Sequence, residues 1–245
     1  MTNIEFSNQF DTLVSSYRRF RDFDNKEPLD TIEFDEYEKS LYLTKAQEEL
    51  VTSLYNGKNP YRESFEQTEE MRRYLSDLVR EGLLSPIENS TGMILGVDSK
   101  SKFFTLPEDL WFITYESVKI DNGKCEDMST MEVVPVRQDE YHKIKKNPFR
   151  GANSRRSLRL DLSDGVIEIV SKFNVTAYYL RYLKKVRPIV LENMPNSVTV
   201  NGEGHESSCE LHEALHQRIL EMAVLMALRS KGYNVRDNNT ENNSR

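Results

Sequence analysis

Long apolar runs and cysteines are both scarce in this sequence of 245 residues. It holds no stretch of about 18 consecutive apolar residues, so no membrane-spanning helix is predicted. The opening MTNIEFSNQF lacks the basic region and apolar stretch of a signal peptide, so export is not predicted either. Two cysteines, Cys125 and Cys209, are too few for a disulfide framework. We therefore expect a protein that is made and kept in a cytoplasm, with both cysteines as ordinary core thiols.

Motifs for nucleotide and calcium chemistry are also absent from the sequence. There is no Gly-rich phosphate loop, no Walker signature and no G-x-S-x-G, and the acidic cluster DTIEFDEYEK at 30–39 lacks EF-hand spacing. Carboxylates are so abundant that no pair stands out as a general acid and base. The sequence therefore predicts no cofactor.

Charge is distributed unevenly along the chain. Residues 1–140 hold 16 Lys and Arg against 29 Asp and Glu, whereas residues 141–245 hold 17 against 11, which gives net charges of −13 and +6. This polarity disfavours a general nucleic-acid binder and suits a subunit that meets complementary neighbours. The plainer alternative is that both charged surfaces simply face solvent.

The apolar periodicity predicts an α+β protein. Helical spacing is found at 4–22, 34–55 and 209–231, and Ser64 with Gln67 resembles a capping box that opens a further helix to about Val79. Strands are predicted at 93–97, 110–120 and 131–136, and a hairpin at 156–173 turns at Asp164-Gly165, with a short helix around 137–146 before it. The segments VTAYYLRYLKK and RPIVLE are predicted to form further strands or one long ribbon. We expect an N-terminal helical layer, a central antiparallel β region with hairpins, and a long C-terminal helix that packs on the N-terminal helices.

Four regions are expected from these elements. They are an N-terminal helical region at 1–85, a mixed and mostly β region at 90–200, the C-terminal helix at 205–233 and a polar tail at 234–245. The tail is rich in Asn, so we expect it to be disordered in the isolated protein and to become ordered on assembly.

The sharpest enzymatic motif is H-E-x-x-H at His212, Glu213 and His216. On a helix this spacing places two imidazoles on one zinc ion, with the glutamate as general base. Cys209 would share a helical face with both histidines, which allows a structural Cys/His site as a further possibility. A zinc metalloprotease is therefore an alternative hypothesis.

The remaining ligands of such a site are missing. A metzincin needs a glycine and a third histidine where this chain has Ile219 and Met222. Glu221 is too near on the same helix, and Glu241 lies in the polar tail. The absence of a third ligand favours two histidines without a metal.

The only concentrated cationic patch is the segment YHKIKKNPFRGANSRRSLR at 141–159, which holds seven basic residues and no acidic one, with Tyr141 and Phe149 interleaved. The candidate contact residues are Lys143, Lys145, Lys146, Arg150, Arg155 and Arg156. A second basic run adds Arg181, Lys184 and Lys185. An acidic neighbouring protein is the favoured partner on grounds of complementarity, and non-specific contact with DNA phosphates is the alternative.

Six strings together carry a resemblance to a known family, and they span nearly the whole chain. They are FDEYEKSLYLTKAQEELVTSLYNG at 34–57, SFEQTEEMRRYLSDLV at 64–79, PEDLWFITYESV at 107–118, DEYHKIKKNPFRGANSRRSLRLDL at 139–162, YLRYLKKVRPIVLE at 179–192 and CELHEALHQRILEMAVLMA at 209–227. In order and spacing they resemble the neck or ring proteins, also called head–tail connectors, of crAss-like tailed phages. His212 is not part of the family pattern, which weakens the zinc hypothesis further.

The resemblance implies a virion protein without catalytic activity, assembled in the host cytoplasm. Such a protein would form a ring of twelve copies that stacks on or near the portal, continues the DNA channel and connects head to tail. Its implied partners are copies of itself, the portal and other neck or tail proteins.

Overall fold

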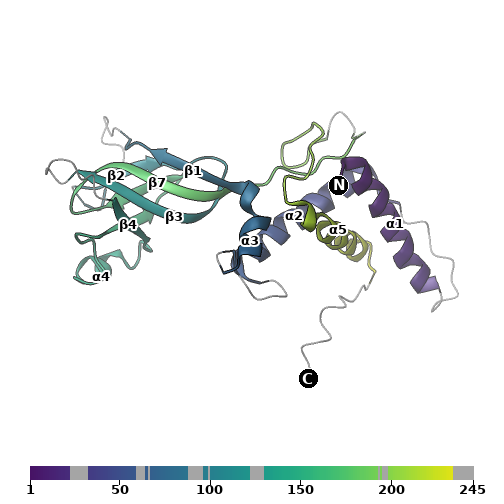
Figure 1. Cartoon of the computed structure of the whole chain (residues 1–245), viewed down its shortest axis with the longest axis horizontal. Helices are drawn as coiled ribbons and strands as arrows, with labels where there is room; N and C mark the ends of the chain where they lie inside the picture. The colour runs from purple at the N-terminus through teal and green to yellow at the C-terminus, as the bar shows by residue number, and fades with distance from the viewer. Residues whose placement is uncertain are drawn as a thin grey trace, which may run out of the picture. The chain divides into compact units, whose positions relative to one another are not determined.

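The chain divides into two units in the computed structural model (Figure 1). The structure describes residues 1–22, 33–58, 64–65, 67–87, 96–98, 100–121, 130–192, 194 and 198–233. Unit 1 combines residues 1–77 with 186–245, and unit 2 is formed by 78–185. Unit 1 holds 16 basic and 25 acidic residues, whereas unit 2 holds 17 and 15, so their net charges are −9 and +2. The charge asymmetry of the sequence is therefore also an asymmetry between the units.

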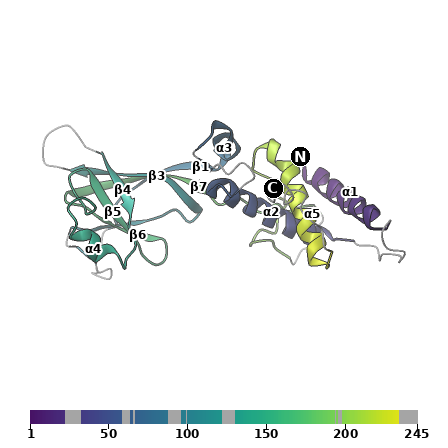
Figure 2. The same ribbon diagram turned by 90° about the horizontal axis from the view of Figure 1, so that it is seen from below.

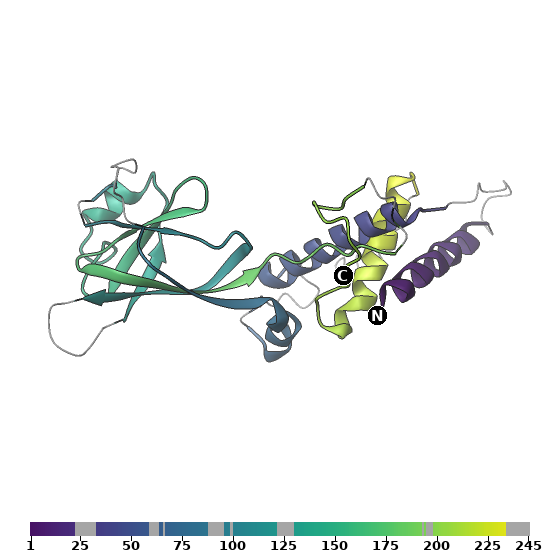
Figure 3. The ribbon, with the colours of Figure 1, turned by 90° about the horizontal axis from the view of Figure 1, so that it is seen from above.

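Three amphipathic helices form the core of unit 1: α1 (Asn3–Asp22), α2 (Glu36–Asn56) and α5 (His216–Ser230) (Figure 3). The side chain of Asp35 caps α2 by accepting a hydrogen bond of 2.7 Å from the Glu38 amide, and Gly57, at φ 70°, ends the helix. The fully buried residues that the three helices contribute include Phe6, Phe10, Leu43, Leu50, Ile219 and Ala223. The expected packing of the C-terminal helix on the N-terminal helices is confirmed. None of the described helices is both long and apolar enough to cross a lipid bilayer.

An extended segment packs against α2 through side chains of that helix. Ser40 Oγ accepts from the Leu191 amide at 3.0 Å, Thr44 Oγ1 accepts from the Ile189 amide at 3.0 Å, and Gln47 Nε2 donates to the Arg187 carbonyl at 2.7 Å. These three polar residues lie on one face of α2 and supply the partners that a neighbouring strand would otherwise give. The prediction of a strand in RPIVLE is therefore wrong, because Val190 is the one residue of this segment that forms a β-bridge, and its partner is Ser207.

The third predicted helix is much shorter than expected. The capping-box bond is present, with the Ser64 amide donating to Gln67 Oε1 at 2.6 Å, but α3 (Glu69–Tyr74) is capped by Thr68. After the 3₁₀ turn η1 (Ser76–Leu78), the chain enters β1 (Val79–Leu84) of unit 2, which the sequence did not predict.

Unit 2 is a curled sheet in which the described residues form strands in the order β1-β7-β3-β4-β5-β6-β2 (Figure 3). The remaining bounds are β2 (Lys102–Thr105), β3 (Leu110–Asp121), β4 (Thr130–Pro135), β5 (Arg156–Asp161), β6 (Val166–Val170) and β7 (Asn174–Lys184). All pairs are antiparallel except β4 with β5. The core between the curled faces includes Phe104, Val118, Ile169, Tyr178 and Leu180. The α+β fold and its mostly antiparallel sheet are confirmed, and the parallel pair is the departure from the expectation.

The predicted hairpin is β5–β6, and Asp164 and Gly165 turn it with φ of 57° and 69°. Residues 93–95 of the strand predicted at 93–97 lie outside the described residues, and Gly96 and Val97 are not in a strand. Cys125 and the polar tail also lie outside the described residues. The short helix predicted around 137–146 is α4 (Tyr141–Lys145), which lies in the connection between the parallel strands β4 and β5.

An ion pair is buried inside unit 2. Arg159 Nη1 lies 2.8 Å from Glu116 Oε2, with exposures of 11% and 10%, and the Tyr178 hydroxyl donates to the same oxygen at 2.8 Å. Burial raises the pKa of Glu116, while the positive charge of Arg159 opposes that rise. The three side chains join β3, β5 and β7 beneath the surface of the sheet.

Candidate functional site

The two histidines of the H-E-x-x-H motif do not lie on one helix. His212 precedes the 3₁₀ turn η2 (Glu213–Leu215) and caps it, since its Nδ1 accepts a hydrogen bond of 3.2 Å from the Ala214 amide. His216 is the first residue of α5. The i, i+4 geometry of an α-helical zinc site is therefore not formed, and the zinc metalloprotease hypothesis is wrong in its structural premise.

His216 has a structural role. It is 5% exposed, its Nε2 lies 2.9 Å from the Leu211 carbonyl, and its Nδ1 lies 2.7 Å from the Met1 amine. The amine can only donate, so Nδ1 accepts and Nε2 carries the proton that is donated to Leu211. Neither nitrogen keeps a lone pair for a metal. Burial lowers the pKa of His216, which favours this neutral form.

The cysteine that could have completed a Cys/His site is also engaged elsewhere. Cys209 lies outside any helix, before η2 and α5, and its thiol donates to Gln47 Oε1 on α2 at 3.2 Å. Burial raises the pKa of the thiol to about 11, so it is protonated at neutral pH. Among the residues that the structure describes, no three His, Cys, Asp or Glu side chains are grouped to hold a metal ion.

The first basic segment forms α4 and the loop that follows it, which we call the basic loop (residues 142–156). It is the crossover connection that the parallel strands β4 and β5 require. Figure 2 shows α4 beside these strands. Apart from Arg156, which begins β5 opposite Glu132, the basic loop has no β-ladder partner, and most of its cationic side chains are exposed.

Local hydrogen bonds fix the backbone of the basic loop. Asn147 Oδ1 accepts from the amides of Phe149 and Arg150 at 2.9 and 3.2 Å, and Asn153 Oδ1 accepts from two further amides. Gly151 donates to the Asn147 carbonyl at 2.8 Å, and a Cβ at this glycine would meet the same oxygen at 2.9 Å. The loop is therefore held in one shape that only glycine permits at position 151.

The six predicted basic residues of the loop divide into two groups. Lys145 is paired with Asp98 at 3.0 Å, which raises the pKa of its amine, and Arg156 Nη1 donates to the Phe149 carbonyl at 3.3 Å. The other four, Lys143, Lys146, Arg150 and Arg155, are exposed and form no ion pair with any described residue. These four are the available cations of the loop.

An exposed aromatic side chain lies in the same loop as these cations, next to Arg150 in the sequence. Phe149 is 85% exposed, the highest value among the exposed large hydrophobic residues of the described chain. The sequence showed its place between basic residues but did not identify it as a contact residue, because its exposure depends on the Asn147 turn. Exposed aromatics next to arginines are typical of the energetic centres of protein interfaces.

The second basic run is separate from the loop. Arg181 pairs with Glu81 on β1 at 2.9 Å and with the Tyr179 hydroxyl at 2.9 Å, while Lys184 and Lys185 lie where β7 ends. α4 and the end of β7 lie at opposite ends of unit 2 (Figure 1). The two predicted basic groups therefore form no single patch.

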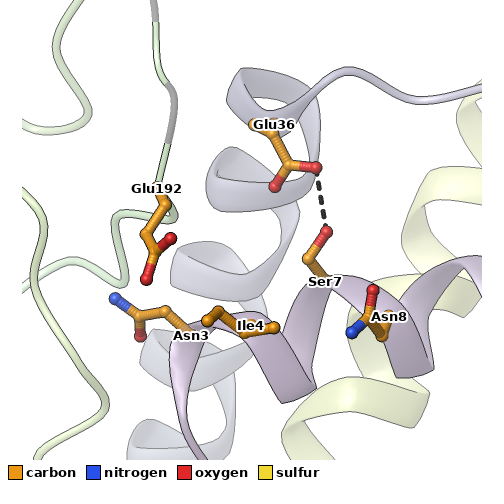
Figure 4. Close-up of a pocket in the computed structure, with 6 residues that line it drawn as sticks. All are labelled: Asn3, Ile4, Ser7, Asn8, Glu36 and Glu192. Atoms are coloured by element: carbon orange, nitrogen blue, oxygen red, sulfur yellow. Dashed lines mark hydrogen bonds between the residues drawn. The ribbon is translucent and has the colours of Figure 1, made fainter.

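Unit 1 carries an acidic hollow that the sequence gave no sign of. It has a volume of about 310 Å³ and lies where α1 begins, lined by Asn3, Ile4, Ser7, Asn8, Glu36 and Glu192 (Figure 4). Ile4 is 55% exposed at its wall. Glu36 accepts from Ser7 Oγ at 2.8 Å and pairs with Lys39, whereas Glu192 is exposed and has no ion-pair partner among the described residues.

Comparison with known proteins gives three findings. A family model described as phage tail ring protein 3/4 of the crAss group matches residues 1–240. The chain is 44% identical over 236 residues to ring protein 3 of Bacteroides phage crAss001, covering 94% of this chain and 96% of that protein. It is also 28% identical over 232 residues to ring protein 4/5 of the same phage, covering 91% and 90%.

Proposed function

This chain belongs to the crAss phage tail ring protein 3/4 family, and from that premise we propose that twelve copies form a ring that stacks on or near the portal and continues the DNA channel toward the tail. It is a structural component of the phage virion and not an enzyme. The ring itself follows from the family. The stacking, the copy number and the channel are our proposal, and they rest on the resemblance of the sequence to neck proteins.

The basic loop is the proposed docking site within this assembly. The observation that supports it is Phe149, 85% exposed on a loop whose backbone is fixed by Asn147 and Asn153. A rigid loop loses little conformational entropy on binding. A loop that carries both an exposed aromatic side chain and several cations is complementary to an acidic protein surface with an apolar centre.

An acidic protein is favoured over DNA as the partner of the loop. DNA binding without sequence preference needs several phosphate contacts, and two of the six loop cations are already engaged within the chain. A large exposed phenylalanine adds nothing to contact with a duplex backbone, whereas it contributes strongly when a protein surface covers it. If the loop contacted packaged DNA instead, the affinity of the chain for duplex DNA would fall steeply as the salt concentration rises, and neutralising Arg155 and Arg156 would reduce that affinity.

Cryo-electron microscopy of purified particles tests the proposal. We expect a closed ring of twelve copies of this chain that contacts the portal or the ring next to it and surrounds the DNA. A ring located at the far end of the tail would contradict the stacking, and another copy number would contradict the stoichiometry. The DNA-binding alternative is tested by measuring the affinity of the purified chain for duplex DNA at two salt concentrations.

A further inference from the structure

A closed ring of identical subunits requires two different surfaces on every copy, one of which meets the other on the next copy. Resting on the proposed ring, we propose that Phe149 of one subunit inserts into the acidic hollow at the start of α1 of its neighbour. The basic loop and the acidic hollow are then the two halves of one head-to-tail contact. The exposed phenylalanine and the cations of the loop complement the empty volume and the carboxylates of the hollow.

The projecting half is the basic loop. Phe149 is 85% exposed, and the cations Lys143, Lys146, Arg150 and Arg155 have no ion-pair partner among the described residues. Two loops of this kind cannot face each other, because like charges would meet around the aromatic rings. A symmetric contact through this loop is therefore disfavoured, and a different, acidic surface must receive it.

The receiving half has room for an aromatic side chain and carboxylates for the cations that accompany it. A cavity of about 150 Å³ is enough to hold benzene, and the hollow measures about 310 Å³. Ile4, 55% exposed, offers an apolar contact for the phenyl ring, and Glu192, which lies beside Asn3 (Figure 4), has no ion-pair partner among the described residues. Glu206 lies next to the hollow, where it accepts from Asn3 Nδ2 at 2.9 Å.

A buried acceptor also lines the hollow without a partner. Asn3 is 5% exposed, and its amide nitrogen donates to Val190 and Glu206, which fixes the orientation of the amide. Its Oδ1 has no hydrogen-bond partner among the described residues. Burying such an acceptor is costly, and because the atom is itself covered, a donor from a docked loop, such as the Arg150 guanidinium, would relieve that cost only after the Asn3 side chain turned to expose it.

The charges of the two units favour a second copy as the occupant. Unit 1, which holds the hollow, has a net charge of −9, whereas unit 2, which holds the loop, has +2. Because both surfaces are present on every copy, repetition of one contact accounts for a ring without a further partner.

Zero-length carbodiimide cross-linking of purified particles tests this contact in the native assembly. The reagent joins a lysine amine to a carboxylate that lies against it. We expect peptides that join Lys143 or Lys146 to Glu192 or Glu206, in a band at twice the mass of the chain. Copies that link to each other only through other lysines, such as the exposed Lys172, would overturn the contact and leave the ring intact. Particles in which no two copies of the chain are linked would count against the ring as well.

Substitutions on both halves supply a second measurement. Phe149→Ala should weaken self-association of the purified chain about 30-fold, as removal of a central interface aromatic does. Ile4→Arg should weaken it at least as much, because it places a cation where the loop brings its own. Tyr115→Ala is the matched control, since Tyr115 is also an exposed aromatic of unit 2, at 52%, and should change association by less than about threefold. All three residues are exposed, so unchanged circular dichroism is expected, and equal effects of Phe149→Ala and Tyr115→Ala would overturn the proposal.

Discussion

Arg159→Met tests the buried ion pair that joins three strands of unit 2. The guanidinium lies 2.8 Å from Glu116 Oε2, and both side chains are about nine-tenths buried. Removing it leaves a carboxylate inside the sheet that still accepts a hydrogen bond from the Tyr178 hydroxyl. Methionine fills a similar volume, so the change is mainly one of charge rather than of packing.

The expected loss of stability follows from the desolvated carboxylate. Removing one partner of a buried ion pair costs about 3–5 kcal/mol, because the other charge stays buried without compensation. The second contact of Arg159, at 2.9 Å to Asp161, adds little, since Asp161 is 66% exposed. For a chain of this length each kcal/mol lowers the melting temperature by about 2–4 °C, so the melting temperature of the chain should fall by about 6–20 °C.

Acidification should reduce this defect. Burial raises the pKa of Glu116 and Arg159 opposes the rise, so the variant should have a still higher pKa at Glu116. A carboxyl whose pKa is raised in the folded state gives its full stability below the unfolded pKa of about 4.3 and loses it as the pH rises through the folded value. The difference between variant and unsubstituted chain should therefore shrink as the pH falls from 7 toward 5.

Differential scanning calorimetry of the full chain at several pH values measures both effects. Arg137→Met is the matched control, because Arg137 pairs with Asp139 at the surface with exposures of 75% and 64%, and it should cost less than about 1 kcal/mol. The triple variant Arg159→Met, Glu116→Leu and Tyr178→Phe removes every member of the cluster and should be much less destabilised than Arg159→Met alone. A melting temperature for Arg159→Met equal to that of Arg137→Met would refute the reasoning.

Two further predictions concern the histidine and the hairpin turn. Because burial lowers the pKa of His216, its contribution to stability is present above the unfolded pKa of about 6.5 and falls as the pH drops below that value. His216→Ala should therefore cost about 2 kcal/mol at pH 7.5 and weaken this pH dependence, whereas His212→Ala should cost less than about 1 kcal/mol. Chemical denaturation at pH 7.5 and pH 5 measures both effects. Gly165→Ala should cost about 1–2 kcal/mol, because φ is 69° at this position even though no atom lies within 4 Å of an added Cβ. Asp164→Asn should be tolerated, because asparagine adopts positive φ more readily than most residues. Equal thermal stability of the two variants would contradict this explanation.

The elements that the sequence predicted well are those with local signals. Asp35 and Gly57 mark the ends of α2, and Asp164-Gly165 marks a hairpin whose two residues both have positive φ. Strand β1 was missed because VREGLL has no alternation of its own and is set by pairing with β7. At Gly82 a Cβ would lie 3.0 Å from the Leu180 side chain, so that glycine permits close packing across the pair.

Non-local contacts also explain what was missed at the candidate sites. The helical spacing from Cys209 to Lys231 is continuous in the sequence, but α5 begins only at His216, because Cys209 and Leu211 are bound to Gln47 and His216 outside a helix. Periodicity cannot show where such a helix starts. The basic residues of the loop were identified by composition alone, whereas the acidic hollow combines residues from three distant segments and has no signature in the sequence.

The position of the basic loop is a consequence of the sheet topology. β4 and β5 are parallel neighbours, and parallel strands cannot be joined by a tight turn, so a connection of a dozen or more residues is unavoidable there. Such a connection makes no ladder bonds, and its backbone needs must be met locally, as Asn147 and Asn153 do. A segment with those properties can carry a high density of cations and an exposed aromatic without disturbing the core. The same fold that needs the crossover thus creates the surface from which Phe149 projects.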